Sequence, residues 1–333
     1  MLGFLYSKEG DACFEPTSSF RLPHAGCPTG WYAADVRHGR ILVSADVSSI
    51  PPRKDFIVLN PMTGDAQRLR MPQFEYNDFW AATLLCATLG CDHLDCPSGG
   101  PFSVVFLGTD ESDEFTSACI YSSEADTWSE TTSVEHPKNC FLRGSSALGR
   151  SALYFACFDS TQILEYSLGN GELSFIGLPP GCNGNDGVPM IAEEGGLEFA
   201  VHESKLYIWL REDGPEGCAG WTQQRVIDLV NLFPDCVLSI PFILVASADG
   251  IGVIFVRRGN MLFTVDLKSL QVTKVWEGTH IHNIIPYMSF CTPALTVPST
   301  SKEPKSGCLK CSINLRNTKK LLMKYGVRSL SAA

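Results

Sequence analysis

The sequence lacks the features that mark secreted and membrane proteins. Its N-terminus, MLGFLYSKEG, has no basic stretch, and its apolar run is too short for a secretory signal peptide. No apolar run approaches the length that crosses a bilayer, because Arg, Asp or Gly interrupts each one. We therefore expect a soluble protein with no membrane partner, in a reducing compartment: the cytoplasm, the nucleus or both.

Positive charge is scarce outside the C-terminal end. The formal charge of the chain is −10, and from Pro298 onward eight Lys or Arg face the single acid Glu303, so this end carries +7 and residues 1–297 carry −17. Nucleic-acid binding requires clustered Lys and Arg against phosphates, so an acidic body argues against a nucleic-acid partner. Neutral or basic protein surfaces are the expected partners.

Catalytic and cofactor motifs are also missing. The sequence has no G-x-x-x-x-G-K-[ST] phosphate loop and no G-x-S-x-G elbow, and its seven histidines are scattered. The acidic pair Glu193-Glu194 lies in AEEGGLE, which is typical of a solvated loop. We predict no catalytic residue, no cofactor and no enzyme activity.

Cysteine is plentiful, with fourteen residues, but its placement does not indicate a disulfide scaffold. Most cysteines lie inside apolar segments, such as Cys119 in SACIYSS and Cys157 in LYFACFDS. Free thiols in such segments behave as small core residues.

A two-part unit, a strand-like run followed by a second strand with a polar turn, returns five times. The first halves are short and rich in β-branched or aromatic residues; they lie at 38–45, 101–109, 150–158, 204–211 and 250–258. In three of the partner runs a polar residue opens a short turn: Asn60, Ser167 and Asp266. Such side chains bond the backbone two residues on, and a following Gly supplies positive φ, so each partner run is predicted to be a hairpin.

The spacing of these units favours a β-propeller. Equivalent turn positions at Asn60, Ser122, Ser167, Asp228 and Asp266 are 62, 45, 61 and 38 residues apart, and loop insertions account for the longer intervals. Propeller blades recur about every 40–50 residues, and strand pairs so spaced must stack to bury their apolar faces. We predict an all-β fold, a propeller of about six blades over residues 1–297, with the completeness of the first blade left open. A β-sandwich or two small β domains is the alternative.

Two segments stand outside the repeat. Residues 77–89 have the best helix signal, although a buried strand fits them equally well. Residues 298–333 begin with the Pro-, Ser- and Lys-rich run PSTSKEPKSG and are predicted to be a flexible basic tail, either disordered or a marginal helix.

Several segments in order resemble the F-box-associated β-propeller domains abundant in plants, especially grasses. They cover about residues 2–290 and are LGFLYS with FEPTSSF, ADVRHGRILVSA, FIVLNPMTGDAQRLRMP, CDHLDCPSGGPFSVVFLGTD, ACIYSSEADTWSE and IIPYMSF. The resemblance implies a substrate receptor of a ubiquitin ligase, in which an N-terminal F-box docks onto the Skp1 adaptor and the propeller recruits a target protein. No F-box precedes LGFLYS, so the sequence departs from the family pattern at the segment that docks onto Skp1, and an adaptor or decoy without ligase coupling is the alternative.

Candidate site residues are few. Asp92, His93 and Asp95 of the polar segment CDHLDC are the residues we expect to face a partner. The same region offers Cys86, Cys91, His93 and Cys96 as zinc ligands, but their spacing within one stretch does not form two separated knuckles, so we predict no metal site. Cys308 and Cys311 are expected to be solvated thiols. The alternative from a different class is a propeller hydrolase of glycans or esters.

Overall fold

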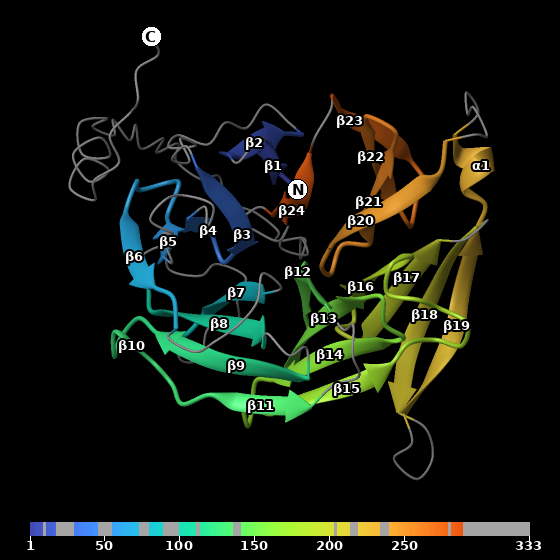
Figure 1. Cartoon of the computed structure of the whole chain (residues 1–333). Coiled ribbons are helices and arrows are strands. Elements are labelled where there is room, and N and C mark those ends of the chain that lie inside the picture. Colours follow the sequence, from blue (N-terminus) through green and yellow to red (C-terminus); the bar gives the residue numbers. More distant parts are fainter. Residues whose placement is uncertain are drawn as a thin grey trace, which may run out of the picture.

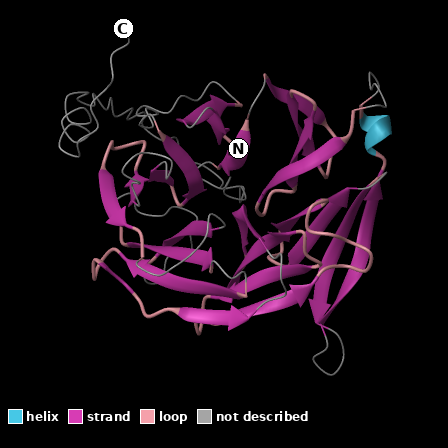
Figure 2. Cartoon of the chain, viewed as in Figure 1, coloured by secondary structure: helices cyan, strands magenta, loops and turns pink. Residues whose placement is uncertain are grey.

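The computed structural model is a ring of six antiparallel β-sheets (Figure 1). It describes residues 1–8, 11–17, 30–45, 55–72, 80–88, 100–110, 114–135, 141–202, 205–213, 219–233, 240–278 and 281–288. Strands make up most of this part of the chain (Figure 2). The described residues form a six-bladed β-propeller, which confirms the predicted fold class and shows that the sandwich alternative is wrong.

We number the sheets as blades 1 to 6 and give their strands from the innermost outward. Blade 1 contains β24 (His282–Tyr287), β1 (Gly3–Lys8) and β2 (Asp11–Pro16). Blade 2 contains β3 (Trp31–Arg37), β4 (Arg40–Ala45), β5 (Asp55–Leu59) and β6 (Ala66–Arg70). Blade 3 contains β7 (Trp80–Cys86), β8 (Phe102–Thr109), β9 (Phe115–Ser122), and the two short strands β10 (Thr127–Trp128) and β11 (Thr132–Glu135), which both pair with β9.

The other three blades have four strands each. Blade 4 contains β12 (Phe141–Leu148), β13 (Ala152–Phe158), β14 (Gln162–Ser167) and β15 (Leu173–Gly177). Blade 5 contains β16 (Gly187–Ile191), β17 (Leu197–His202), β18 (Leu206–Asp213) and β19 (Ala219–Ile227). Blade 6 contains β20 (Phe242–Ala248), β21 (Val253–Arg258), β22 (Met261–Asp266) and β23 (Val272–Glu277).

Blade 1 closes the ring with strands from both ends of the described chain. β24 pairs antiparallel with β1, and Leu5 lies opposite Ile285. Leu2 N donates a 2.9 Å hydrogen bond to Tyr287 O beyond the end of this ladder. Joining the first and last strands in one sheet pairs the inner edge of β1 with β24, which removes a site for non-native strand pairing.

The hydrophobic core is divided into six clusters, and each cluster fills the space between two neighbouring blades. Strand β8 shows why. Val104 and Phe106 point into the cluster shared with blade 2, whereas Val105 and Leu107 point into the cluster shared with blade 4. A central strand buried on both faces is apolar without alternation, which explains the run SVVFL.

The hairpins between third and fourth strands have one geometry in three blades. Asn60, Ser167 and Asp266 each accept a hydrogen bond from the N–H four residues on and donate their own N–H to the carbonyl five residues on. The side chain of Asp266 also accepts from Lys268 N at 2.9 Å and Ser269 N at 2.8 Å. The predicted polar turns are therefore confirmed.

Blade 5 departs from the predicted pattern. Four of the five first halves are second strands of blades, but the segment 204–211 contributes β18, a third strand. Its partner run forms the outer strand β19 and the short helix α1 (Leu229–Leu232), and Asp228 is the N-cap of this helix instead of a hairpin turn. The second strand, β17, begins within AEEGGLE, the stretch assigned to a loop; Glu193 and Glu194 themselves lie in the exposed turn before it.

The segment 77–89, for which a helix and a buried strand were the alternatives, contains a strand: β7 spans Trp80–Cys86. The tail at 298–333 lies outside the described residues. Within the part of the chain that the structure describes, no helix is long and apolar enough to cross a membrane, and α1 has four residues.

Candidate functional site

Alternating strand directions place the blade turns on two faces. Turns between first and second strands, and between third and fourth strands, lie at the same edge of each blade. We call this the turn face. Contacts between blades show that these edges meet on one side of the ring: Gly250 N donates to Ile191 O at 3.1 Å, and Lys268 Nζ lies 2.6 Å from Glu193 Oε1. Two features of the turn face qualify as functional sites, a charged cluster at the axis and a groove between blades 2 and 3.

The axial cluster centres on Arg37 at the end of β3. Its Nε lies 3.2 Å from Asp35 Oδ2, and its Nη1 lies 2.9 Å from Asp249 Oδ2 in the turn after β20. Its Nη2 donates to the carbonyl and hydroxyl oxygens of Ser146 on β12. Ser146 Oγ in turn lies 2.8 Å from Thr83 Oγ1 on β7. One guanidinium therefore connects blades 2, 4 and 6, and Ser146 extends the network to blade 3.

The cluster is largely buried, with 14% of the Arg37 side chain and 7% of the Asp35 side chain exposed. Burial raises the pKa of Asp35, while Arg37 and the Leu84 N–H oppose that rise. Burial also disfavours the charged form of Arg37, but the two carboxylates outweigh it and raise its pKa above the ordinary value. Arg37 is thus cationic, and its charge is compensated inside the protein.

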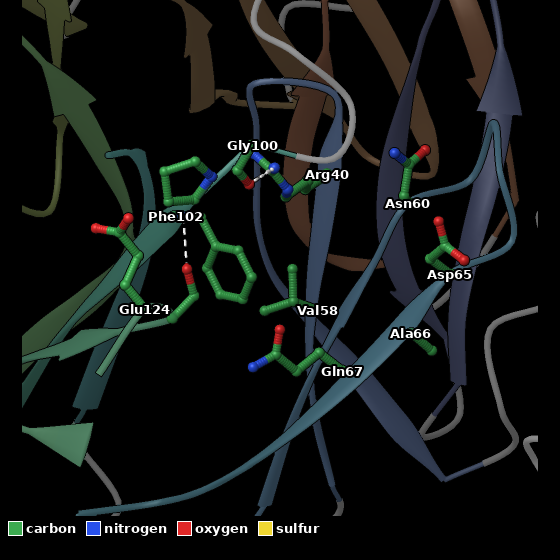
Figure 3. A pocket seen from close by; sticks show the side chains of 11 residues that line it. Arg40, Val58, Asn60, Asp65, Ala66, Gln67, Gly100, Phe102 and Glu124 are labelled. Carbon is green, nitrogen blue, oxygen red and sulfur yellow. Dashed lines mark hydrogen bonds between the residues drawn. The ribbon is translucent and has the colours of Figure 1, made fainter. Parts of the chain in front are cut away.

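The groove has a volume of about 520 Å³ and lies between blades 2 and 3 (Figure 3). Eleven residues from both blades line it: Arg40, Val58, Asn60, Asp65, Ala66, Gln67, Gly100, Pro101, Phe102, Ser123 and Glu124. Most come from the β5–β6 turn, the start of β8 and the β9–β10 turn. The volume falls in the range of about 300–1,000 Å³ typical of ligand pockets.

Arg40 and Phe102 form the deep end of the groove. Arg40 is 5% exposed, donates from Nη2 to Gly100 O, and has its guanidinium carbon 5.3 Å from the centroid of the Phe102 ring. Ser123 fixes the start of β8 by accepting from Phe102 N at 2.8 Å and donating its own N–H to Phe102 O at 3.0 Å. The floor is therefore held in place by contacts between consecutive strands of blade 3 and by Arg40 of blade 2.

The wall of the groove is ordered by a chain of hydrogen bonds. Gln67 Nε2 donates to Tyr121 Oη at 3.1 Å, and Tyr121 Oη donates to Asp126 Oδ1 at 2.5 Å. Burial, with the Asp126 carboxylate as a further cause, raises the pKa of Tyr121 to about 12. Tyr121 is thus a neutral donor that fixes Asp126, and its oxygen fixes the amide of Gln67 across the blade interface.

The site residues expected from sequence lie outside the described residues. Asp92, His93 and Asp95 belong to the connection between β7 and β8, of which the structure describes only the ends, to residue 88 and from residue 100. Cys91 and Cys96 lie there too, while Cys86 is half-buried at the end of β7. Both the partner-facing role and the expected absence of a zinc site in this segment therefore stay predictions.

Sequence reasoning missed Arg37, Asp249 and the groove residues. The polar residues among them lie in or beside turns, and each site is formed with neighbours from another blade. One signal was present: the polar turn positions Asn60 and Ser122 mark the two hairpins that border the groove. It identified the turns without showing that they face each other.

Similar proteins were found at the level of family and of fold. A family model described as F-box protein AT5G49610-like, beta-propeller, matches residues 33–295. No match was found among curated proteins. A fungal alcohol oxidase of the AA5 family in complex with copper is 13% identical with a TM-score of 0.43; the match covers 82% of this chain and 60% of the oxidase.

Two further solved structures are similar at the same level. A protein of unknown function from Bacteroides caccae is 12% identical with a TM-score of 0.47, covering 86% of this chain and 99% of that one. The WD40 domain of SCAP from fission yeast is 11% identical with a TM-score of 0.43, covering 75% of this chain and 53% of that one.

The family match spans blades 2 to 6 and the closing strand β24, and it agrees with the segments that suggested the resemblance. The chain belongs to the F-box protein AT5G49610-like β-propeller family.

Proposed function

We propose that this propeller is a protein-binding module that captures a partner protein on its turn face. The observation that carries the proposal is the groove between blades 2 and 3, about 520 Å³ in volume and bordered by turns from two blades. Loops on a rigid ring can hold a binding surface without reorganisation, which lowers the entropic cost of association. Family membership supports a partner that is a protein.

The test compares variants on the two faces of the full chain. Glu124→Trp fills the groove, whereas Lys205→Trp adds the same side chain to the opposite face, between β17 and β18. Both chains are immobilised in cell extract, and bound proteins are quantified by mass spectrometry. We expect a set of proteins that Lys205→Trp retains and Glu124→Trp loses. Identical sets for the two variants would contradict the proposal.

A more specific form of this proposal is that the protein couples its partner to a ubiquitin ligase. A substrate receptor must engage a Skp1-type adaptor, while an adaptor or decoy protein binds only its target. Calorimetric titration of purified Skp1-type adaptor into the full chain separates the two. Binding would support a receptor of a ubiquitin ligase in the cytoplasm or nucleus, and its absence would favour the decoy or adaptor.

A propeller hydrolase is the second candidate, and one observation favours it: Asp35, Arg37 and Asp249 converge at the axis. Against it, the three charges bond each other and the backbone instead of lining the groove. Turnover of p-nitrophenyl esters or glycosides that disappears in Asp249→Asn would favour the enzyme.

A further inference from the structure

Two carboxylates stand on opposite walls of the groove. Asp65 lies in the β5–β6 turn of blade 2 and Glu124 in the β9–β10 turn of blade 3, and both are exposed. Figure 3 shows them on either side of Phe102. Asp65 accepts a 2.7 Å hydrogen bond from Thr63 Oγ1, and among the described residues no cation forms an ion pair with Asp65 or Glu124. The rim therefore carries two negative charges that the described protein does not neutralise.

The cation on the floor does not cancel this charge at the rim. Arg40 is 5% exposed, and its guanidinium faces Gly100 O and the Phe102 ring. A buried guanidinium that stacks on an aromatic ring already interacts with protein groups and is shielded from the solvent side of the groove. A ligand entering from solvent meets Asp65 and Glu124 before it meets Arg40.

The amide of Gln67 adds an acceptor between the two carboxylates. Because its Nε2 donates to Tyr121 Oη, its Oε1 is turned the other way. Figure 3 shows this oxygen pointing toward Val58 and Phe102 in the middle of the site. The carboxylates have only acceptor atoms, so all three side chains favour ligand groups that are N–H donors.

The remaining walls suit an aliphatic stem. Val58, Ala66 and Pro101 line the groove beside the polar groups. Lys and Arg combine an apolar stem with a donor-rich cationic head, and they bury the stem along apolar surface while the head stays polar. A phosphate or another anion would instead be repelled by the two carboxylates.

We propose that the groove recognises a basic segment of the partner protein and places Lys or Arg head groups against Asp65 and Glu124. The inference rests on the proposed function and specifies the partner's chemistry. Opposite charge at an exposed rim also accelerates encounter, so binding weakens as salt rises.

The experiment selects ligands without assuming their charge. Random 12-residue peptides displayed on phage are selected on the immobilised full chain, and the strongest are measured by fluorescence anisotropy. The groove variant is Asp65→Asn with Glu124→Gln, which keeps side-chain shape and removes two charges. The matched control is Glu172→Gln with Glu194→Gln, which removes two charges from exposed positions elsewhere on the turn face. Thermal unfolding checks that both variants fold.

The predicted result is Lys- or Arg-containing peptides that lose about 10- to 100-fold in affinity for the groove variant and less than about threefold for the control. Equal losses in both variants would overturn the groove assignment, and groove-dependent peptides without Lys or Arg would overturn the assigned chemistry. Either of these outcomes leaves the proposed function intact. Failure to select any peptide that binds contradicts both proposals.

The basic C-terminal end of the chain is the competing occupant. A synthetic peptide copying residues 312–328, SINLRNTKKLLMKYGVR, is tested in the same assay. If it binds more tightly than every selected peptide and shows the same dependence on Asp65 and Glu124, the site belongs to the chain's own tail, which overturns the partner assignment. Weaker binding supports a separate partner protein.

Discussion

Arg37 and Asp249 are 212 positions apart in the chain, yet the guanidinium Nη1 of the first lies 2.9 Å from the carboxylate Oδ2 of the second. Asp249 Oδ2 also accepts from Leu148 N at 3.0 Å. The contact therefore connects the inner ends of blades 2, 4 and 6 at the turn face. We expect these charged groups at the axis to stabilise the ring, and we propose the groove between blades 2 and 3 as the recognition site.

Arg37→Met should destabilise the protein by about 3–5 kcal/mol. The variant keeps a long side chain but leaves the carboxylates of Asp35 and Asp249 without their cation. Urea unfolding followed by tryptophan fluorescence measures the change. Lys268→Ala is the control, because its exposed ion pair with Glu193 should contribute about 1 kcal/mol or less. Equal losses for the two variants would show that the axial network does not stabilise the ring.

Two glycines of one hairpin should respond differently to alanine. Gly171 has φ +71°, and the nearest atom to an added Cβ is Tyr166 Oη at 3.6 Å, so its cost is one of backbone conformation. Gly171→Ala should cost about 1–2 kcal/mol. Gly169→Ala meets nothing within 4 Å and has no positive φ, so it should be neutral or slightly stabilising. Differential scanning calorimetry compares the two, and a Gly169→Ala loss as large as that of Gly171→Ala would refute this account of the turn.

Asp266 should make one hairpin sensitive to acid. The backbone N–H of Ser269, with Lys268 as a further cause, lowers the pKa of its carboxyl below the ordinary value of about 3.9. The resulting stability is present above that value and is lost as pH falls through the folded-state pKa. Asp266→Asn keeps an acceptor, as Asn60 does in blade 2, but cannot titrate. The stability difference from wild type is below about 1 kcal/mol at pH 7 and should shrink as pH falls below about 3.9. A difference that grows in acid would contradict this sign.

Buried thiols should resist alkylation. Cys119 is 3% exposed, and burial raises its pKa to about 12; Cys157 is fully buried. Because the thiolate is the reacting form, N-ethylmaleimide at pH 7.5 should label half-buried Cys86 and Cys182 before Cys119 and Cys157. Peptide mass spectrometry follows each site, and all thiols should react in urea. Early labelling of Cys119 in the native chain would show that the core of blade 3 opens.

Much of the fold was predictable because each propeller blade repeats the same pattern of apolar strands and polar turns. Second strands such as β8 and β13 are buried on both faces, so they stand out as apolar runs, and the turns at Asn60, Ser167 and Asp266 carry residues with a specific backbone role. Blade 5 was assigned incorrectly because β17 starts among glycines and acids, where only its packing reveals a strand. Packing against neighbouring strands therefore outweighed the loop-like local composition where β17 begins.

The site was far less predictable. The groove unites Arg40 of β4, Gln67 of β6 and Glu124 of the β9–β10 turn, and no sequence spacing indicates that these residues meet. Its properties also depend on orientation: Arg40 points its charge into the protein, while Asp65 points its charge outward. The sequence shows that residues 1–297 are acidic overall, which agrees with a basic partner. It does not show which acidic side chains lie at the groove.

Hydrogen–deuterium exchange of the full chain, with and without the tightest selected peptide, tests the central claim most directly. We predict slower exchange in the β5–β6 and β9–β10 turns, which border the groove, and no change in the β17–β18 and β21–β22 turns on the opposite face. Protection confined to the opposite face, or spread evenly over the ring, would contradict the assignment of the turn face as the surface that binds the partner.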